Sequence, residues 1–143
     1  MSVQCASRSL TVAAKPASLY AVTEFVRKAA IEANLPEERL DELYLLVDEL
    51  IMNVCTHAYP DDRPGDVTVT YSVLAPGELM VEVADQGVEF NPLKIEPPDL
   101  TLSVEARPIG GLGVHLVKTF AKSLSYRREQ GWNRLTFGFR AGS

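Results

Sequence analysis

The stretch from Asp41 to Tyr59, DELYLLVDELIMNVCTHAY, most constrains the fold because it carries two helical stripes at once. Glu49, Asn53 and His57 follow one another at steps of four residues, so they line one edge of a helix. Polar groups buried without partners cost about 1–3 kcal/mol each, so this edge faces either water or a polar ligand. The apolar stripe recurs at steps of three and four, as one buried helical face requires: Leu43, Tyr44, Val47, Leu50, Ile51, Val54 and Ala58.

Length and composition indicate one soluble domain spanning residues 1–143, with 46% hydrophobic and 23% charged residues. The net charge of −5 argues against nucleic acid and anionic membranes as main partners. No apolar run reaches the roughly 18 residues of a membrane span, and the first residues do not resemble a signal peptide. The two cysteines, Cys5 and Cys55, suggest neither a disulfide framework nor a metal site. We therefore expect a cytoplasmic protein.

Periodicity along the chain predicts helices on one face of a mixed, mostly antiparallel sheet, which is a two-layer α/β sandwich of the α+β class. A proline-interrupted stretch, residues 85–113, separates the first five predicted elements from the last three. A loop of this length in a compact domain is either a functional lid or a disordered segment. The predicted strands are residues 4–12, 66–74, 79–84, 123–129 and 133–140, and the predicted helices are residues 16–33, 36–59 and 114–122.

Three polar motifs accompany these elements: one lies on the second helix, one at the end of a strand and one directly before the last helix. In the first, the amide oxygen of Asn53 is a suitable ligand for Mg²⁺, and the Glu49 carboxylate one turn earlier can orient or deprotonate a hydroxyl. In the second, Asp85 ends a strand and can accept from an exocyclic amine such as that of adenine, while Gly87 permits close approach to the backbone. The alternatives are a solvated helix edge with one satisfied core polar group, and an ordinary Asp-x-Gly turn.

The third motif, Gly110-Gly111-Leu112-Gly113, directly precedes a predicted helix. Glycines at such a place let backbone N–H groups point at an anion, and the helix N-terminus adds partial positive charge. The alternative is a flexible hinge. The motif lacks the lysine and hydroxyl residue of a P-loop and does not follow a strand as a dinucleotide fingerprint does.

Taken together, ELIMNVCTHAY, DQGVEFNPL and RPIGGLGVHLV resemble the N, G1 and G2 boxes of the GHKL ATPase superfamily, which has the Bergerat fold. Its members include the ATP-binding domains of gyrase and of sensor histidine kinases. The small size, the Asn-x-x-x-His-Ala-Tyr ending and the Phe-Asn-Pro-Leu segment are most similar to bacterial anti-sigma factor serine/threonine kinases. The resemblance extends from about Leu40 to Phe139.

For the first two boxes, the resemblance implies that ATP and Mg²⁺ are the cofactors. Asn53 would bind Mg²⁺, and Glu49 would be the general base or water-orienting group. Asp85 would take the adenine amine, and Gly87 would leave room for the base. His57 would approach the ribose or phosphates, or would be a packed core histidine.

For the rest of the chain, the resemblance makes residues 91–109 the lid over the nucleotide. The segment Gly111-Leu112-Gly113 would hold the phosphates through the N–H groups of its two glycines. Thr136 would help to hold a water on the adenine side. Arg107, at the end of the lid, would reach a γ-phosphate or a protein partner, or would be a solvated loop arginine.

The implied function is an ATP- and Mg²⁺-dependent serine/threonine kinase that acts as an anti-sigma regulator. Such a protein phosphorylates a small antagonist protein and sequesters a sigma factor or a similar target, and it can form a homodimer through its first helix or strand. The alternative is a nucleotide-binding regulatory module that holds partners without significant phosphotransfer. A third option is a sandwich that has lost nucleotide binding.

Overall fold

The computed structural model describes residues 7–61, 63–94 and 120–142. Two long helices, α1 (Leu19–Glu32) and α2 (Leu40–His57), are each preceded by a 3₁₀ turn, η1 (Pro16–Ser18) and η2 (Glu37–Arg39). A third 3₁₀ turn, η3, spans Pro92–Lys94. The strands are β1 (Ser7–Ala13), β2 (Asp66–Ala75), β3 (Glu78–Asp85), β4 (Ser123–Glu129) and β5 (Trp132–Arg140).

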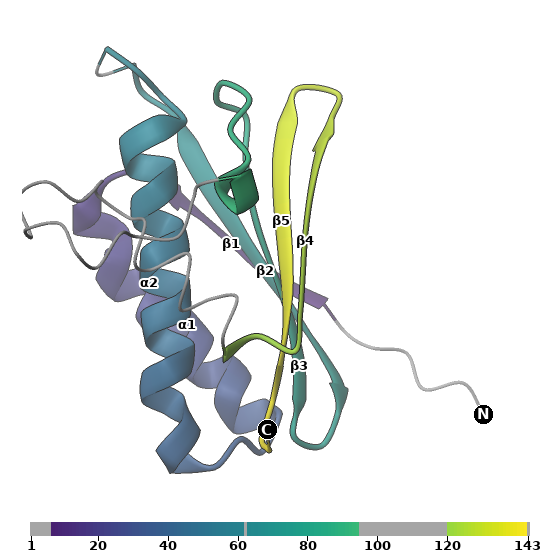
Figure 1. Ribbon diagram of the computed structural model, residues 1–143. Coiled ribbons are helices and arrows are strands. Elements are labelled where there is room, and N and C mark those ends of the chain that lie inside the picture. The colour runs from purple at the N-terminus through teal and green to yellow at the C-terminus, as the bar shows by residue number, and fades with distance from the viewer. Residues whose placement is uncertain (1–6, 62, 95–119, 143) are drawn as a thin grey trace, which may run out of the picture.

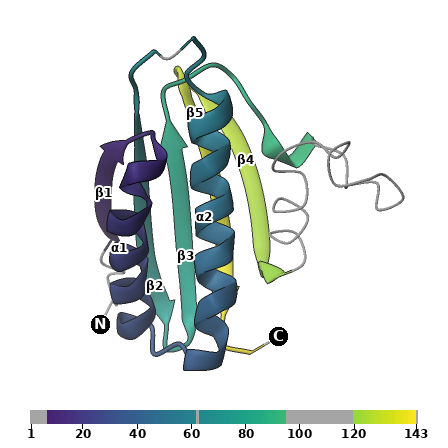
Figure 2. The ribbon, with the colours of Figure 1, turned by 90° about the vertical axis from the view of Figure 1, so that its left-hand side faces the viewer.

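Within the described residues, the five strands form one sheet in the order β1-β2-β3-β5-β4, and all neighbouring strands are antiparallel. Both helices lie on the same face of this sheet (Figures 1 and 2). The predicted two-layer sandwich is therefore confirmed. Because β5 pairs with β3, the order also brings Asp85 directly opposite Asn133, far away in sequence.

The core lies between the helical layer and the sheet. Most of the apolar stripe predicted for α2 is buried, with Leu43 and Ile51 completely so, and Leu46, outside the predicted stripe, is completely buried as well. Acidic residues in η2 and in the first turn of α2 stand where the positive end of the helix dipole stabilises negative charge. The largest fully buried side chains from the sheet are Tyr71, Phe137 and Phe139.

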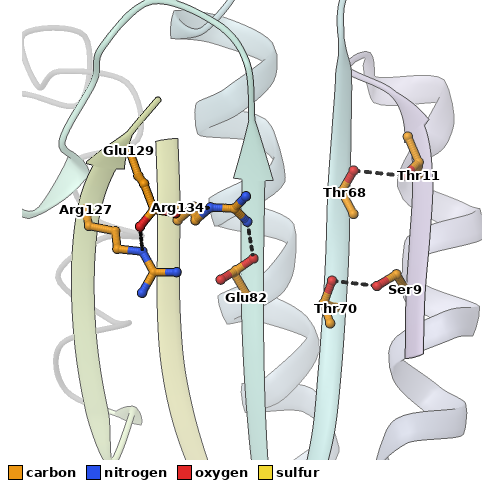
Figure 3. Close-up of polar contacts among 8 residues, drawn as sticks. All are labelled: Ser9, Thr11, Thr68, Thr70, Glu82, Arg127, Glu129 and Arg134. Atoms are coloured by element: carbon orange, nitrogen blue, oxygen red, sulfur yellow. Dashed lines mark hydrogen bonds and ion pairs between the residues drawn. The ribbon is translucent and has the colours of Figure 1, made fainter. Parts of the chain in front are cut away.

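The sheet has a covered face and an open face, as strand alternation requires. On the open face, hydroxyl pairs join β1 to β2, among them Ser9 Oγ to Thr70 Oγ1 at 2.8 Å (Figure 3). Further along this face, Arg134 Nη1 donates to Glu82 Oε1 at 2.9 Å and so joins β5 to β3 (Figure 3). The open face is therefore polar, and many of its side chains pair with one another across neighbouring strands.

Element boundaries agree with the predicted ones to within a few residues. β1 begins at Ser7, and α1 and α2 begin later than predicted because the residues ahead of them form 3₁₀ turns. Of the predicted helix 114–122, only its last residues fall in the described part, where Phe120 is helical. Among the described residues, no helix has the length and apolar character needed to cross a membrane.

Candidate functional site

A pocket opens where the C-terminal half of α2 meets the ends of β3 and β5. It holds about 370 Å³ of space, part of which is open to solvent. Asn53 and Asp85 are among its polar lining residues, and both are only 5% exposed. Apolar side chains make up most of the remaining lining: Leu50, Val54, Ala58, Val83, Phe90, Pro92 and Leu135. An apolar slot with few fixed polar groups is typical of a small-molecule site.

The polar edge of α2 carries two buried atoms that lack a hydrogen-bond partner in the described part of the chain. They are Asn53 Nδ2 and Glu49 Oε1, on residues one helical turn apart. Leaving such atoms unpaired is costly, so their placement fits a site that an added group completes. Rotating the amide of Asn53 exchanges its nitrogen and oxygen, so this side chain can present a donor to a phosphate or an oxygen to a cation.

Burial raises the pKa of Glu49 above its ordinary value. A carboxylate with a raised pKa holds a proton more strongly, which suits a group that accepts a proton during a reaction. Among the residues that the structure describes, no three histidine, cysteine or acidic side chains form a cluster that could hold a metal ion. A cation held at Asn53 would therefore need other ligands, such as phosphate oxygens and water, which is the usual arrangement for Mg²⁺.

Asp85, the last residue of β3, is held by two donors on one oxygen. Its Oδ1 accepts from the backbone N–H of Gly87 at 2.9 Å and from Nδ2 of Asn133 at 2.8 Å. Burial raises the pKa of Asp85, while these two hydrogen bonds and the positive charge of Arg128 act in the opposite direction. Oδ2 accepts no hydrogen bond from the described residues, so the carboxylate keeps an acceptor for a ligand.

Asn133 is the site residue that sequence reasoning missed. It is 5% exposed and is paired with Asp85 across β3 and β5. A signal was present, because Asn133 is in phase with the inward-facing Leu135, Phe137 and Phe139 of the same strand. A polar residue at an inward position of a strand must find partners or line a site.

Gly87 is required by the packing of the fold, and its predicted role beside the base stays a prediction. A Cβ at this position would lie 2.1 Å from the backbone oxygen of Ala58, which is on α2's C-terminal cap. The neighbouring N–H of Val88 donates to that same oxygen at 2.8 Å. The absence of a side chain at Gly87 therefore makes room for the end of α2. The hydrogen bond from Val88 then joins the loop after β3 to this helix end.

His57 stacks on Phe90, with ring centroids 4.4 Å apart and an interplanar angle of 22°. Phe90 in turn lines the pocket. The His57 ring therefore supports a pocket wall formed by an aromatic side chain, and the approach of His57 to the ribose or phosphates stays a prediction.

Thr136 does not join the pocket, and this expectation needs correction. Its cross-strand partners are Glu82 and Ser125, and the side chain shares the open face with Glu82. Asn133 is three residues from Thr136 on β5, and Asp85 is three residues from Glu82 on β3. Since side chains alternate between the two faces of a sheet, Asn133 and Asp85 point to the covered face. Leu135, the neighbour of Thr136, lines the pocket instead.

The remaining predicted site residues, Arg107, Gly111, Leu112 and Gly113, lie outside the described residues. The same holds for the predicted lid over residues 91–109, except for its first four residues. These begin with Asn91, whose Oδ1 accepts from the backbone N–H of Leu93 at 2.9 Å. The roles of Arg107, of the three residues 111–113 and of the lid stay predictions.

The fold and this pocket define a class of protein: a helix-on-sheet sandwich whose ligand slot is lined by a buried amide of the helix, Asn53, and by a carboxylate at a strand end, Asp85. The family model for the histidine kinase-like ATPase domain matches residues 12–139. The chain belongs to this family. The predicted membership of the GHKL superfamily is thus confirmed.

Curated relatives place the chain near one branch of that family. It is 33% identical over 94 residues to the serine/threonine-protein kinase BtrW of Bordetella bronchiseptica, covering 66% of each chain. It is 30% identical over 96 residues to the serine-protein kinase RsbW of Bacillus mycoides, covering 64% of this chain and 59% of the relative. The matched part therefore spans just under two-thirds of these relatives' lengths.

Solved structures support the fold independently. The RsbU and RsbW domains of Rv1364c from Mycobacterium tuberculosis match with a TM-score of 0.65 at 15% identity, covering 94% of this chain and 32% of that one. The histidine kinase domain of a blue-light activated kinase from Erythrobacter litoralis matches with a TM-score of 0.55 at 24% identity, covering 74% of this chain and 46% of that one.

Proposed function

We propose that the chain is an ATP- and Mg²⁺-dependent serine/threonine protein kinase that acts as a partner-switching anti-sigma regulator. The observation that carries this proposal is the edge of α2, where Glu49 and Asn53 hold buried polar atoms without partners in the described residues. These two atoms need polar partners, and the family resemblance puts Mg²⁺ and the phosphates at this place. The similarity to named serine kinases supports the same activity.

In this proposal the residues divide the work between binding and proton transfer. Asp85 accepts a hydrogen bond from the adenine amine through Oδ2, and Asn53 contributes an oxygen to the Mg²⁺ site. Bound Mg²⁺ supplies neutralisation of the phosphate charge. Glu49 accepts the proton of the substrate hydroxyl while the bond from its oxygen to the γ-phosphorus forms and the bond from that phosphorus to the ADP oxygen breaks. The raised pKa of Glu49 makes it a stronger base for that step.

The proposed partners are a small antagonist protein, which supplies the serine or threonine, and a sigma factor or similar target that the chain holds. The protein would act in the cytoplasm. A homodimer through α1 is part of the proposal, and Tyr20 and Ile31 on that helix are 78% and 61% exposed.

Phosphotransfer can be tested without knowing the antagonist in advance. The purified chain is added with γ-labelled ATP and Mg²⁺ to an extract of its own host cells that lack the gene. We expect label on the serine or threonine of a small protein, with no such label when Glu49→Gln replaces the parent. If Glu49→Gln labelled the same protein as strongly as the parent does, the role of Glu49 would be contradicted.

The alternative, a nucleotide-binding module without significant phosphotransfer, predicts a different result in cells. Glu49→Gln would then regulate its target as fully as the parent. A regulated target together with no labelled protein would replace the kinase proposal by this alternative.

A further inference from the structure

Asn133 makes hydrogen bonds with every polar atom of its side chain. Its Nδ2 donates to Asp85 Oδ1 and to the backbone oxygen of Val88, both at 2.8 Å. Its Oδ1 accepts from Tyr126 Oη at 2.6 Å, from Arg128 Nη1 at 3.1 Å and from the backbone N–H of Phe90 at 3.3 Å. A guanidinium and an amide N–H can only donate, and a carboxylate and a carbonyl can only accept, so the amide has one possible orientation.

This fixed orientation limits what Asp85 can bind. Each carboxylate oxygen has two acceptor positions. On Asp85 Oδ1 these are taken by Asn133 Nδ2 and the Gly87 N–H, and Oδ2 accepts from none of the described residues. The carboxylate therefore offers one free oxygen to the pocket.

One free oxygen distinguishes between the two purines. The adenine edge presents one amino donor beside a ring nitrogen that accepts. The guanine edge presents two neighbouring donors, a ring N–H and an amino group, and a carboxylate with both oxygens available binds these together.

We propose that Asn133 is a specificity-determining residue, which occupies one oxygen of Asp85 and so makes the pocket select adenine over guanine nucleotides. This inference rests on the proposed nucleotide-binding function. Asn133 acts through Asp85 and is a positioning residue.

The same hydrogen bonds hold the pocket wall in place. Arg128 Nη1, which donates to Asn133, also donates to the backbone oxygen of Gly87 at 2.8 Å. Asn133 itself contacts the backbone of Val88 and Phe90. The loop after β3 is thus tied to β4 and β5 through one amide, so the purine edge meets a carboxylate in a fixed position.

The test is a calorimetric titration of the whole chain with ADP and with GDP, in the presence of Mg²⁺. The parent should bind ADP more tightly. In Asn133→Ala the ratio of the GDP to the ADP dissociation constant should fall by about three- to tenfold, the effect of one hydrogen bond. Thr136→Val, on the open face of the same strand, is the matched control and should keep the parent ratio. An unchanged ratio in Asn133→Ala would overturn the inference.

A second variant, Asn133→Asp, keeps the proposal falsifiable if the alanine variant does not fold. The new carboxylate and Asp85 would share one proton, and in that form the new group still donates to Oδ1. The charged and titratable groups around the pair are Arg128 and Tyr126 of β4, Tyr59 after α2, and Glu89. ADP affinity of this variant should fall at least several-fold more than that of the parent as the pH rises from 5 to 8, because two neighbouring carboxyl groups that share one proton give it up well above the ordinary pKa of a carboxyl group.

The two proposals fail in different ways. If the parent binds neither ADP nor GDP at millimolar concentration, the proposed function itself is refuted. If the parent binds ADP but the Asn133→Asp variant shows the same pH profile as the parent, only the role of Asn133 is refuted.

Discussion

Replacing Gly87 by alanine should destabilise the protein through its contact with α2. An added Cβ would lie 2.1 Å from the backbone oxygen of Ala58, 2.5 Å from its backbone carbon and 2.6 Å from its Cβ. Two of these atoms belong to the main chain at the helix end, so relief requires moving α2 away from the loop after β3. That movement also weakens the hydrogen bond from the Val88 N–H to the Ala58 oxygen.

Overpacking of this kind costs about 2–3 kcal/mol, which for a chain of this size lowers the melting temperature by roughly 6–10 °C. Thermal unfolding followed by circular dichroism measures the loss. Gly142→Ala is the control, because a Cβ there has nothing within 4 Å, and it should change the melting temperature by less than about 2 °C. A Gly87→Ala variant as stable as the parent would refute the close contact.

Three further predictions concern other parts of the site and the sheet. Since burial raises the pKa of Glu49, the negative charge of this carboxylate opposes folding at neutral pH. Glu49→Gln should therefore raise the melting temperature at pH 7 by about 1–2 °C. In melts measured across pH, this difference should vanish below the unfolded-state pKa of a glutamate, about 4.3. His57→Ala removes the ring stacked on Phe90 and should cost about 0.5–1.5 kcal/mol in denaturant unfolding, whereas no loss would mean the stack contributes nothing. Glu82→Gln breaks the ion pair with Arg134 on the open face; it should cost less than about 1 kcal/mol, less still at high salt, and leave ADP titrations unchanged.

Much of the fold was predictable because it depends on local periodicity. The apolar stripe of α2 and the alternation of Leu135, Phe137 and Phe139 each indicate one buried face. Packing these two faces together gives a layer of helices on one side of a sheet. Asn53 and Asp85 were predictable for a similar reason. Asp85 continues the inward-facing phase of Leu79, Val81 and Val83, and Asn53 is marked by its spacing of four residues from Glu49 and from His57.

The parts that could not be predicted depend on which strands are neighbours. The inward phase of Asn133 can be seen in the sequence, but its contact with Asp85 depends on β5 pairing with β3 in the register that sets the two residues opposite each other. The role of Gly87 depends on the approach of Ala58 from another element. Similarity to a motif position does not locate Thr136, because the alternation of its strand buries Leu135 and Phe137 and turns Thr136 to the open face.

The measurement that tests the central claim most directly is a calorimetric titration with ATP, with and without Mg²⁺, of the parent, Asn53→Ala and Asp85→Asn. Both replaced residues line the pocket and are 5% exposed. The account predicts Mg²⁺-dependent ATP binding by the parent that weakens at least about tenfold in each variant, since each loses a charge-assisted contact or a metal ligand. Equal ATP affinity in all three proteins, or no binding by the parent at millimolar ATP, would contradict it.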